Sequence, residues 1–308
     1  MNQFDSACKD SIPEEREFHL NGFRYAAQYW PAISRGAEQP VIALHGWLDN
    51  SASFDLLAPI LSRDTHANVL APDLAGHGKS DHRNGFSDYP VWSEILAILA
   101  MADDMGWQQF TLVGHSRGAM IAMMLASLYP QRVSKLVLID AVGPSPAIAT
   151  ESPMKMLKSL QEMQRRVKRK KSCYPSFNAA IEARTKSEVT KVNIGTAKRL
   201  AVRGLSELEE GFHWHADDKL WAFGHLPLTP EQVFAFAEKV SSPTLILMAN
   251  KGLRAFIKDN PDALRLTNAL IEELNASVKD FEDGHYLHME LSSKEVGSTI
   301  SDFILGRA

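Results

Sequence analysis

The chain has 308 residues, of which 45% are hydrophobic and 23% are charged, as in an ordinary globular protein. The length fits one large α/β core with an insertion as well as it fits two domains. A net charge of -4 and a pI near 6.3 argue against a general nucleic-acid-binding protein.

We expect no secretory or membrane-targeting segment from this sequence. The first residues lack the basic start and the apolar core of a signal peptide, and no apolar run approaches membrane-spanning length. The two cysteines, Cys8 and Cys173, fit no metal-ligand or redox spacing. We therefore expect free thiols, a cytoplasmic location and no stable membrane insertion.

The first predicted element is a β-hairpin over residues 15–20 and 23–30, because Asn21-Gly22 favours the positive φ angles of a two-residue turn. Apolar strands and helices then alternate. They cover residues 40–46 (strand), 54–61 (helix), 68–73 (strand), 91–105 (helix), 110–113 (strand), 119–129 (helix) and 135–140 (strand). This alternation predicts an α/β fold with a mostly parallel sheet covered by helices on both faces, and ligands bind at the carboxyl ends of such strands.

The alternation stops near residue 143, and about ninety residues follow without a convincing buried strand. Helical patterns occupy residues 153–171, 177–186 and 196–204, followed by an aromatic, irregular stretch over residues 212–223. The alternation resumes with a strand (243–249), a helix (262–275), a strand (277–282) and a helix (293–305). We predict a core made of residues 1–144 and 231–308, and an inserted helical cap over residues 145–230.

The turn after residue 113 reads Gly114-His115-Ser116-Arg117-Gly118, a G-x-S-x-G motif. Joining a strand to a helix in so few residues forces the serine into a strained conformation and leaves no room for side chains two positions away, which explains the glycines. The turn exposes the Ser116 hydroxyl at the carboxyl end of the sheet. A motif of this kind in a strand–turn–helix context indicates a nucleophile.

These elements, in this order, resemble the α/β-hydrolase superfamily over nearly the whole chain. The stretch His45-Gly-Trp-Leu-Asp-Asn-Ser-Ala-Ser-Phe54 resembles the serine hydrolase-like branch of that superfamily. The resemblance implies a triad in the chain order Ser, Asp or Glu, His, together with an oxyanion hole and a helical lid over the pocket.

Within this pattern Ser116 is the expected nucleophile, and a histidine must lie within reach to take its proton. His285 follows Gly284 just past the last predicted strand, and Gly-His followed by an apolar residue matches the histidine loop of the superfamily. His288, three residues later, is the competing base and is expected to be a structural neighbour.

The triad acid departs from the commonest pattern. Many relatives carry it in the loop after the strand at 243–249, where this chain has Gly252. Other branches place it at the end of the strand that follows the elbow, and Asp140 ends that strand. We predict that Asp140 orients His285, with Asp259 or Asp283 as weaker candidates and turn capping by Asp140 as the alternative.

The oxyanion hole of the fold uses two backbone N–H groups, which here belong to Trp47 and Arg117. The substrate pocket is expected to include side chains from the early strand, the elbow and the cap. These are His45, His115, Trp214 and Trp221. His45 also fits a buried, hydrogen-bonded role, and the motif from Asp73 to Ser80 is interpreted as a structural turn.

Two weaker signals lie in the cap. Six of the seven residues over 165–171 are basic, and we interpret them as the solvated face of a helix whose apolar stripe is Leu157, Leu160, Met163 and Val167. An anion, lipid or nucleic-acid surface is the alternative. His213-Trp214-His215 lacks a third ligand, so we expect neither a metal site nor a cofactor.

The sequence thus predicts a serine hydrolase that cleaves carboxylic esters of a small, apolar substrate through an acyl-enzyme, without nucleic-acid partners. Other serine-dependent chemistry of the fold is the first alternative: carbon–carbon bond, thioester or lactone hydrolysis, or perhydrolysis. A ligand-binding protein with a silent triad is the second. The natural substrate and the oligomeric state stay open.

Overall fold

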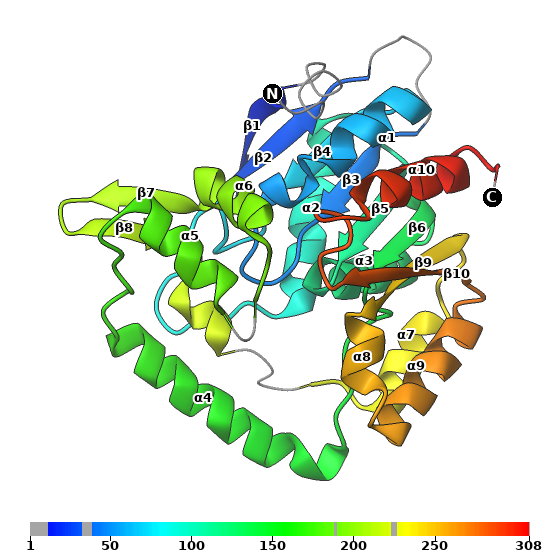
Figure 1. Cartoon of the computed structure of the whole chain (residues 1–308). Helices are drawn as coiled ribbons and strands as arrows, with labels where there is room; N and C mark the ends of the chain where they lie inside the picture. The colour runs from blue at the N-terminus through cyan, green and yellow to red at the C-terminus, as the bar shows by residue number, and fades with distance from the viewer. Residues whose placement is uncertain (1–11, 33–38, 188–189, 223–226, 308) are drawn as a thin grey trace.

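The computed structural model describes residues 12–32, 39–187, 190–222 and 227–307 (Figure 1). Its main feature is an eight-stranded sheet, which confirms the predicted α/β class. The strands lie in the order β1 (Glu14–Leu20), β2 (Phe23–Trp30), β4 (Val69–Pro72), β3 (Val41–Leu44), β5 (Phe110–His115), β6 (Val133–Ile139), β9 (Thr244–Lys251) and β10 (Ser277–Gly284). Strands β1, β2 and β4 pair antiparallel, and the remaining pairs are parallel.

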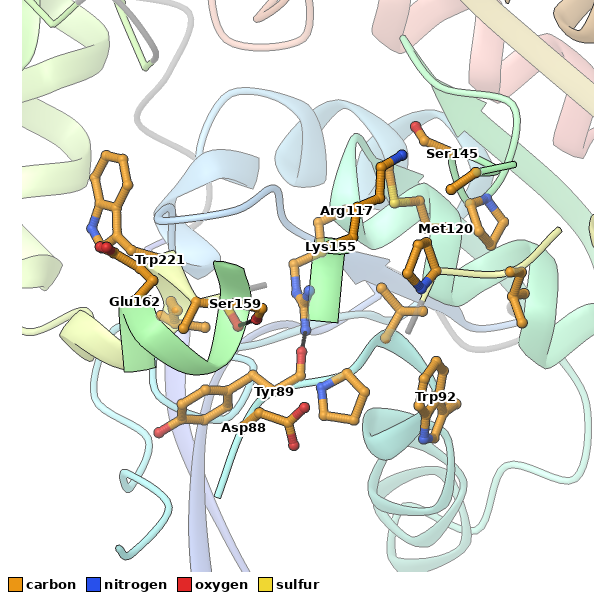
Figure 2. Close-up of a pocket in the computed structure, with 18 of the residues that line it drawn as sticks. Asp88, Tyr89, Trp92, Arg117, Met120, Ser145, Lys155, Ser159, Glu162 and Trp221 are labelled. Atoms are coloured by element: carbon orange, nitrogen blue, oxygen red, sulfur yellow. Dashed lines mark hydrogen bonds between the residues drawn. The ribbon is translucent and has the colours of Figure 1, made fainter. Parts of the chain in front are cut away.

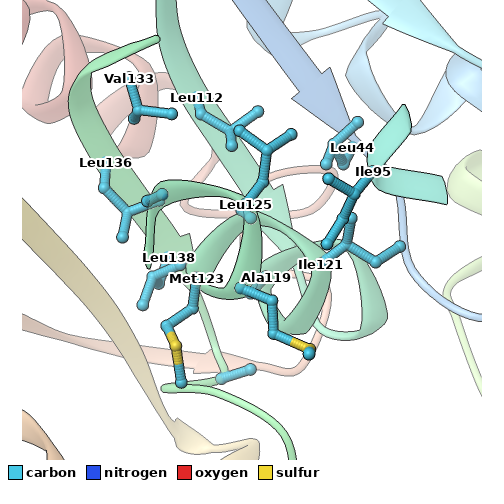
Figure 3. Close-up of a cluster of buried hydrophobic side chains, with 14 of the residues drawn as sticks. Leu44, Ile95, Leu112, Ala119, Ile121, Met123, Leu125, Val133, Leu136 and Leu138 are labelled. Atoms are coloured by element: carbon cyan, nitrogen blue, oxygen red, sulfur yellow. The ribbon is translucent and has the colours of Figure 1, made fainter. Parts of the chain in front are cut away.

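Helices cover both faces of the sheet, as the apolar strands require. Alternate residues of β3 face opposite sides: Ile42 and Leu44 pack in one apolar cluster, and Val41 and Ala43 in the other. The first face carries α2 (Ile95–Asp104), α3 (Arg117–Leu128), α7 (Pro230–Ala237) and α9 (Pro261–Glu273), and the second carries α1 (Leu57–Thr65) and α10 (Ser293–Ile304). Figure 3 shows α3 packed into the first cluster, between side chains of β5 and β6.

Residues 145–230 are here called the cap segment, and their described parts lie on one side of the sheet in Figure 1. Their elements are η3 (Ala149–Glu151), α4 (Ser152–Lys168), α5 (Phe177–Thr185), α6 (Ile194–Gly204), β7 (Leu205–Leu208), β8 (Gly211–Trp214) and η4 (Asp218–Trp221). The predicted apolar stripe of α4 differs in the structure. Met163 is buried, whereas Leu157, Leu160 and Val167 are 45–48% exposed.

Some short elements escaped the sequence prediction. Strands β7 and β8 form a two-stranded hairpin where we expected no strand and an irregular stretch. Each has four residues, mostly half-buried or exposed, and so shows no apolar run. Helices α7 and α8 (Leu253–Ile257), and the 3-10 turn η1 (Ser51–Phe54), are likewise too short for a helical period to stand out. The helix predicted over residues 91–105 begins with a 3-10 turn, η2 (Val91–Glu94), and continues as α2.

The structure also bears on the expected free thiols and on membrane insertion. Cys173 is a free, exposed thiol, and Cys8 lies outside the described residues. Among the described residues, no helix has the length and apolar character needed to span a bilayer.

A buried ion pair fastens α6 of the cap segment to the core. The Arg203 Nε donates to both carboxylate oxygens of Asp73, at 3.0 and 2.8 Å. The backbone N–H groups of Ser51 and Lys79 donate to the same carboxylate at 2.7 and 2.8 Å. Gly78, at φ +50°, passes so close that a Cβ there would lie 2.2 Å from the Asp73 carboxyl carbon. This crowding explains the glycine and supports the structural interpretation of the motif.

Removing one partner of this pair should destabilise the protein strongly. Arg203→Met leaves the Asp73 carboxylate buried without its cation, so we expect a loss of about 3–5 kcal/mol in the free energy of unfolding. Urea unfolding followed by circular dichroism measures it. Lys198→Met, an exposed position on the same helix, is the control. Equal stability of the two variants would contradict the assignment.

Candidate active site

The elbow between β5 and α3 holds Ser116 in a conformation that side chains rarely adopt, with φ +51° and ψ -113°. A Cβ at Gly114 would lie 2.4 Å from the Gly118 carbonyl oxygen, and a Cβ at Gly118 would lie 2.0 Å from the Leu44 carbonyl oxygen. The Ser116 N–H donates to the Ile139 carbonyl at 3.0 Å, which anchors the turn to β6. The two glycines therefore let the strands and α3 approach closely enough to form the turn.

The predicted acid and base meet. The His285 Nδ1 lies 2.6 Å from the Asp140 Oδ2, within a charge-assisted hydrogen bond. The Asp140 side chain is fully buried, whereas that of His285 is 38% exposed. Backbone N–H groups of Ala249 and Leu253 also donate to the Asp140 carboxylate, at 2.8 and 2.9 Å. Three hydrogen bonds thus hold the carboxylate in one orientation toward the imidazole.

Gly252 explains why the commoner acid position is empty. A Cβ on this residue would lie 2.2 Å from the Asp140 Oδ2. The space that a side chain at position 252 would occupy is therefore filled by the carboxylate from position 140. A side chain at position 252 and the Asp140 carboxylate therefore cannot occupy this space at once.

The alternative residues lie in other settings. His288 is fully buried, and its Nε2 forms a 2.8 Å hydrogen bond with the Ser53 hydroxyl. The Asp283 carboxylate accepts hydrogen bonds from two backbone N–H groups near its own loop, at 2.7 and 2.9 Å. The Asp259 side chain is 89% exposed. Within the described residues, none of the three forms a hydrogen bond or ion pair with His285 or Ser116.

Trp47 and Arg117, the expected oxyanion-hole residues, follow β3 and begin α3. Arg117 stands in the first turn of its helix, where backbone N–H groups have no partner within the helix. The side chains have other uses. The Trp47 indole donates to the Leu220 carbonyl at 2.9 Å and lies edge-on to Trp221, and the buried Arg117 guanidinium donates to the Tyr89 carbonyl (Figure 2).

Two cavities border this region. The larger, here called the apolar cavity, measures about 740 Å³ and lies between the cap segment and the core (Figure 2). Its wall includes Trp92, Arg117, Met120, Leu220, Trp221 and Leu228. The smaller, here called the basic cavity, measures about 420 Å³. Arg117 lines the apolar cavity, although its neighbour Ser116 and His285 do not.

The four predicted pocket residues divide into two pairs. Trp221 lines both cavities, and Trp214 lines the basic cavity. His45 and His115 line neither and have no exposed surface. The His45 ring bonds to the Gly46 carbonyl at 2.8 Å and accepts from the Leu74 N–H at 3.0 Å, so it fits the structural role that the sequence also allowed.

The histidines of the 213–215 stretch also differ from each other. His213 is buried and lies 3.8 Å from a Glu210 oxygen. Both ring nitrogens of His215 are engaged, one with the Gly78 carbonyl at 2.7 Å and the other with the Ser206 hydroxyl. Within the described ranges, no three His, Cys, Asp or Glu side chains gather as a metal-ion cluster.

Comparison with known proteins identifies the family. The model of the alpha/beta hydrolase fold matches residues 39–172. A protein called probable serine hydrolase from Drosophila melanogaster is 30% identical over 271 residues, which cover 85% of this chain and 79% of that protein. The chain belongs to the α/β-hydrolase superfamily. Within it, the chain falls in the serine hydrolase-like branch, as the resemblance predicted; a serine hydrolase-like protein from Danio rerio is 28% identical, covering 86% of this chain and 81% of that protein.

Solved structures agree with this assignment. A hypothetical protein from Pseudomonas aeruginosa PAO1 superposes with a TM-score of 0.85 at 32% identity, covering 95% of this chain and 99% of that one. The thioesterase domain from the curacin biosynthetic pathway superposes with a TM-score of 0.78 at 21% identity, covering 96% and 100%, and shares the fold.

Beneath the candidate site of this α/β hydrolase lies a cluster of buried histidines. The His115 ring lies 4.2 Å from that of His288, centroid to centroid, and its Nε2 bonds to the His285 carbonyl at 2.9 Å. Burial lowers the pKa of His45 to about 4 and that of His288 to about 3, and lowers the pKa of His115 well below its usual value. All three rings are therefore neutral at pH 7, so the loop that carries His285 packs on uncharged side chains.

This cluster makes stability depend on pH. Below about pH 6.5, the pKa that a histidine has in the unfolded chain, these histidines are protonated in the unfolded state but not in the folded state. Their contribution to the free energy of unfolding therefore becomes less favourable as the pH falls. His288→Asn removes one such ring. We expect the variant to be less stable than the wild type at pH 7, and the difference in unfolding free energy to shrink by about 2 kcal/mol by pH 4.5.

Urea unfolding at several pH values measures this difference, with exposed His19→Asn as the control for replacing a histidine. If the difference in unfolding free energy between the wild type and His288→Asn stays constant with pH, the buried His288 ring is protonated as readily in the folded state as in the unfolded state, which contradicts the prediction.

Proposed function

We propose that the protein is a serine hydrolase that cleaves carboxylic ester bonds through an acyl-enzyme intermediate. The observation that carries this proposal is the 2.6 Å hydrogen bond between the buried Asp140 carboxylate and the half-exposed His285 ring. Ser116 in its strained elbow supplies the third group. In the superfamily these three residue types form a triad in this chain order.

The proposed reaction begins at His285. Because Asp140 bonds to Nδ1, the other ring nitrogen is free to take the proton from the Ser116 hydroxyl while the serine oxygen attacks the ester carbonyl. Backbone N–H groups of Trp47 and Arg117 stabilise the negative oxygen of the tetrahedral intermediate. The imidazolium, stabilised by Asp140, then gives its proton to the departing alcohol.

The second half repeats these steps with water. His285 takes a proton from the water molecule, hydroxide attacks the acyl carbon, and collapse of the second intermediate returns the proton to Ser116 and releases the acid. The apolar cavity is the proposed site of the acyl group, because Arg117 and Met120 in its wall belong to the first turn of α3, directly after Ser116. Burial of acyl carbons against Met120 and Leu220 favours apolar acids.

Loss of the nucleophile is the first test. Ser116→Ala should lower kcat for p-nitrophenyl butyrate by about a thousandfold or more, because no other group forms the acyl-enzyme. The thermal unfolding midpoint should not fall. A fluorophosphonate probe should label the wild type and spare the variant. Ser127→Ala, in the same helix, is the control and should hydrolyse like the wild type. Ser116→Ala retaining full activity would refute the proposal, and a folded wild type that the probe does not label would favour a ligand-binding protein.

The shared space of positions 140 and 252 allows a second test. Asp140→Gly should reduce kcat/KM for the same ester by about a thousandfold, because His285 loses its orienting carboxylate. Adding Gly252→Asp should recover at least about tenfold of that loss. The new Cβ starts 2.2 Å from where the original carboxylate oxygen stood.

The matched control pairs Asp140→Gly with Asn250→Asp, which adds an acid near the end of β9, two residues before position 252, where the Asn250 amide bonds to Glu282. Equal recovery in both double variants would mean that a nearby negative charge suffices. No recovery in either would mean that position 252 cannot reach the histidine.

A further inference from the structure

The basic cavity has no part in the mechanism described above. Its wall contains four basic residues and one acidic residue: Arg166, Arg169, Lys171, Arg184 and Asp218. The first three belong to the basic run that the sequence pattern assigned to a solvated helix face. In the structure α4 ends at Lys168, and the last part of the run turns into the wall of a cavity.

Two of these cations already have counter-charges. The Arg166 Nε donates to the Glu162 carboxylate at 2.5 Å, and the Arg184 Nη2 donates to the buried Asp49 carboxylate at 2.6 Å. The Arg184 Nε is buried without a partner, so this guanidinium keeps one unused donor in the low-dielectric interior.

The other two cations are not neutralised in this way. Within the part of the chain that the structure describes, Arg169 is exposed and makes no ion pair. Lys171 donates from Nζ to the His215 carbonyl at 3.0 Å, and the carboxylates of Asp217 and Asp218 act on it only from beyond ion-pair distance. Burial lowers the pKa of Lys171, and the nearby Asp218 opposes that shift. A half-buried ammonium with one neutral acceptor is an electrostatic arrangement that an anion would stabilise.

The basic cavity also adjoins the proposed oxyanion hole. Leu48, directly after Trp47, is part of its wall. Trp221 lines this cavity and the apolar cavity, lies 4.6 Å from Trp47 between ring centroids, and carries the Arg166 guanidinium 4.9 Å above its ring. A substrate whose carbonyl sits between the N–H groups of Trp47 and Arg117 therefore has the apolar cavity on one side and the basic cavity on the other. The wall of the apolar cavity also carries charges of both signs, on Asp88, Lys155, Lys158, Glu162 and Lys219, whereas the basic cavity has Asp218 as its one acidic wall residue among those described.

We propose that the basic cavity binds a phosphate group carried by the alcohol or thiol portion of the substrate, while the acyl group occupies the apolar cavity. This assignment rests on the proposed function. Arg169 and Lys171 supply the charge, and the hydroxyls of Ser172 and Tyr174 in the same wall supply neutral donors. The substrates are then acyl esters or thioesters of a phosphorylated carrier.

A matched pair of substrates tests the assignment: S-butyryl pantetheine and S-butyryl 4′-phosphopantetheine, which differ by one phosphate. We expect the wild type to prefer the phosphorylated thioester by about tenfold or more in kcat/KM, through a lower KM. Arg169→Gln combined with Lys171→Gln should bring the ratio of the two kcat/KM values close to one.

The control removes the same charge from the same run. Lys168→Gln combined with Lys170→Gln changes two exposed residues outside the cavity wall, and it should keep the wild-type ratio. Circular dichroism checks that both double variants fold. Equal kcat/KM for the two thioesters in the wild type overturns the assignment. An equal loss of preference in both double variants also overturns it, because a long-range field would then account for the effect.

Binding separates this proposal from the proposed function. Calorimetric titration of Ser116→Ala with both thioesters should give a Kd about tenfold lower for the phosphorylated one, and this readout needs no turnover. If the wild type hydrolyses neither thioester nor p-nitrophenyl butyrate but the two Kd values differ in this way, the anion site stands and the hydrolase proposal fails. If Ser116-dependent ester hydrolysis is found while the two Kd values are equal, the anion site fails alone.

Discussion

The close approach of α3 to β3 is the constraint on which the candidate site depends. A Cβ at Gly118 would lie 2.0 Å from the carbonyl oxygen of Leu44, so the helix reaches the sheet only because this residue has no side chain. That approach shortens the turn after β5 and places Ser116 at φ +51°. It also sets the start of α3 against the backbone of Leu44 and His45, at the beginning of the loop that carries Trp47. The geometry of the proposed nucleophile and oxyanion hole therefore depends on the close packing that Gly114 and Gly118 allow.

The same reasoning applies to the acid. Asp140 and Gly252 are far apart in the sequence, but the structure shows that they compete for one volume next to His285. A chain that carries the carboxylate after β6 must keep position 252 small, and a chain that carries it after β9 has no use for it at position 140. A glycine at position 252 therefore favours a triad carboxylate at position 140, and this can be recognised from one sequence without relatives.

Local patterns predicted what depends on local chemistry. Asn21-Gly22 gives the hairpin, the apolar runs give the central strands, and the elbow follows from its two glycines. Contacts that join distant parts of the chain could not be predicted, because nothing near Asp73 in the sequence points to Arg203. The buried pair of Asp49 and Arg184 escaped for the same reason, although Asp49 stands within the motif that indicates the branch. The short strands β7 and β8 lack an apolar run.

The two buried ion pairs have a consequence for how a ligand enters. Arg203 on α6 and Arg184 on α5 each hold a fully buried carboxylate of the core, so swinging these two helices away would strand charges in an apolar interior. Helix α4 has no such anchor: Ser159 and Met163 are its buried side chains, and several residues of its wall border the apolar cavity. Displacing α4 would therefore leave no core carboxylate without its cation, so the apolar cavity opens at lower electrostatic cost beside α4 than beside α5 or α6.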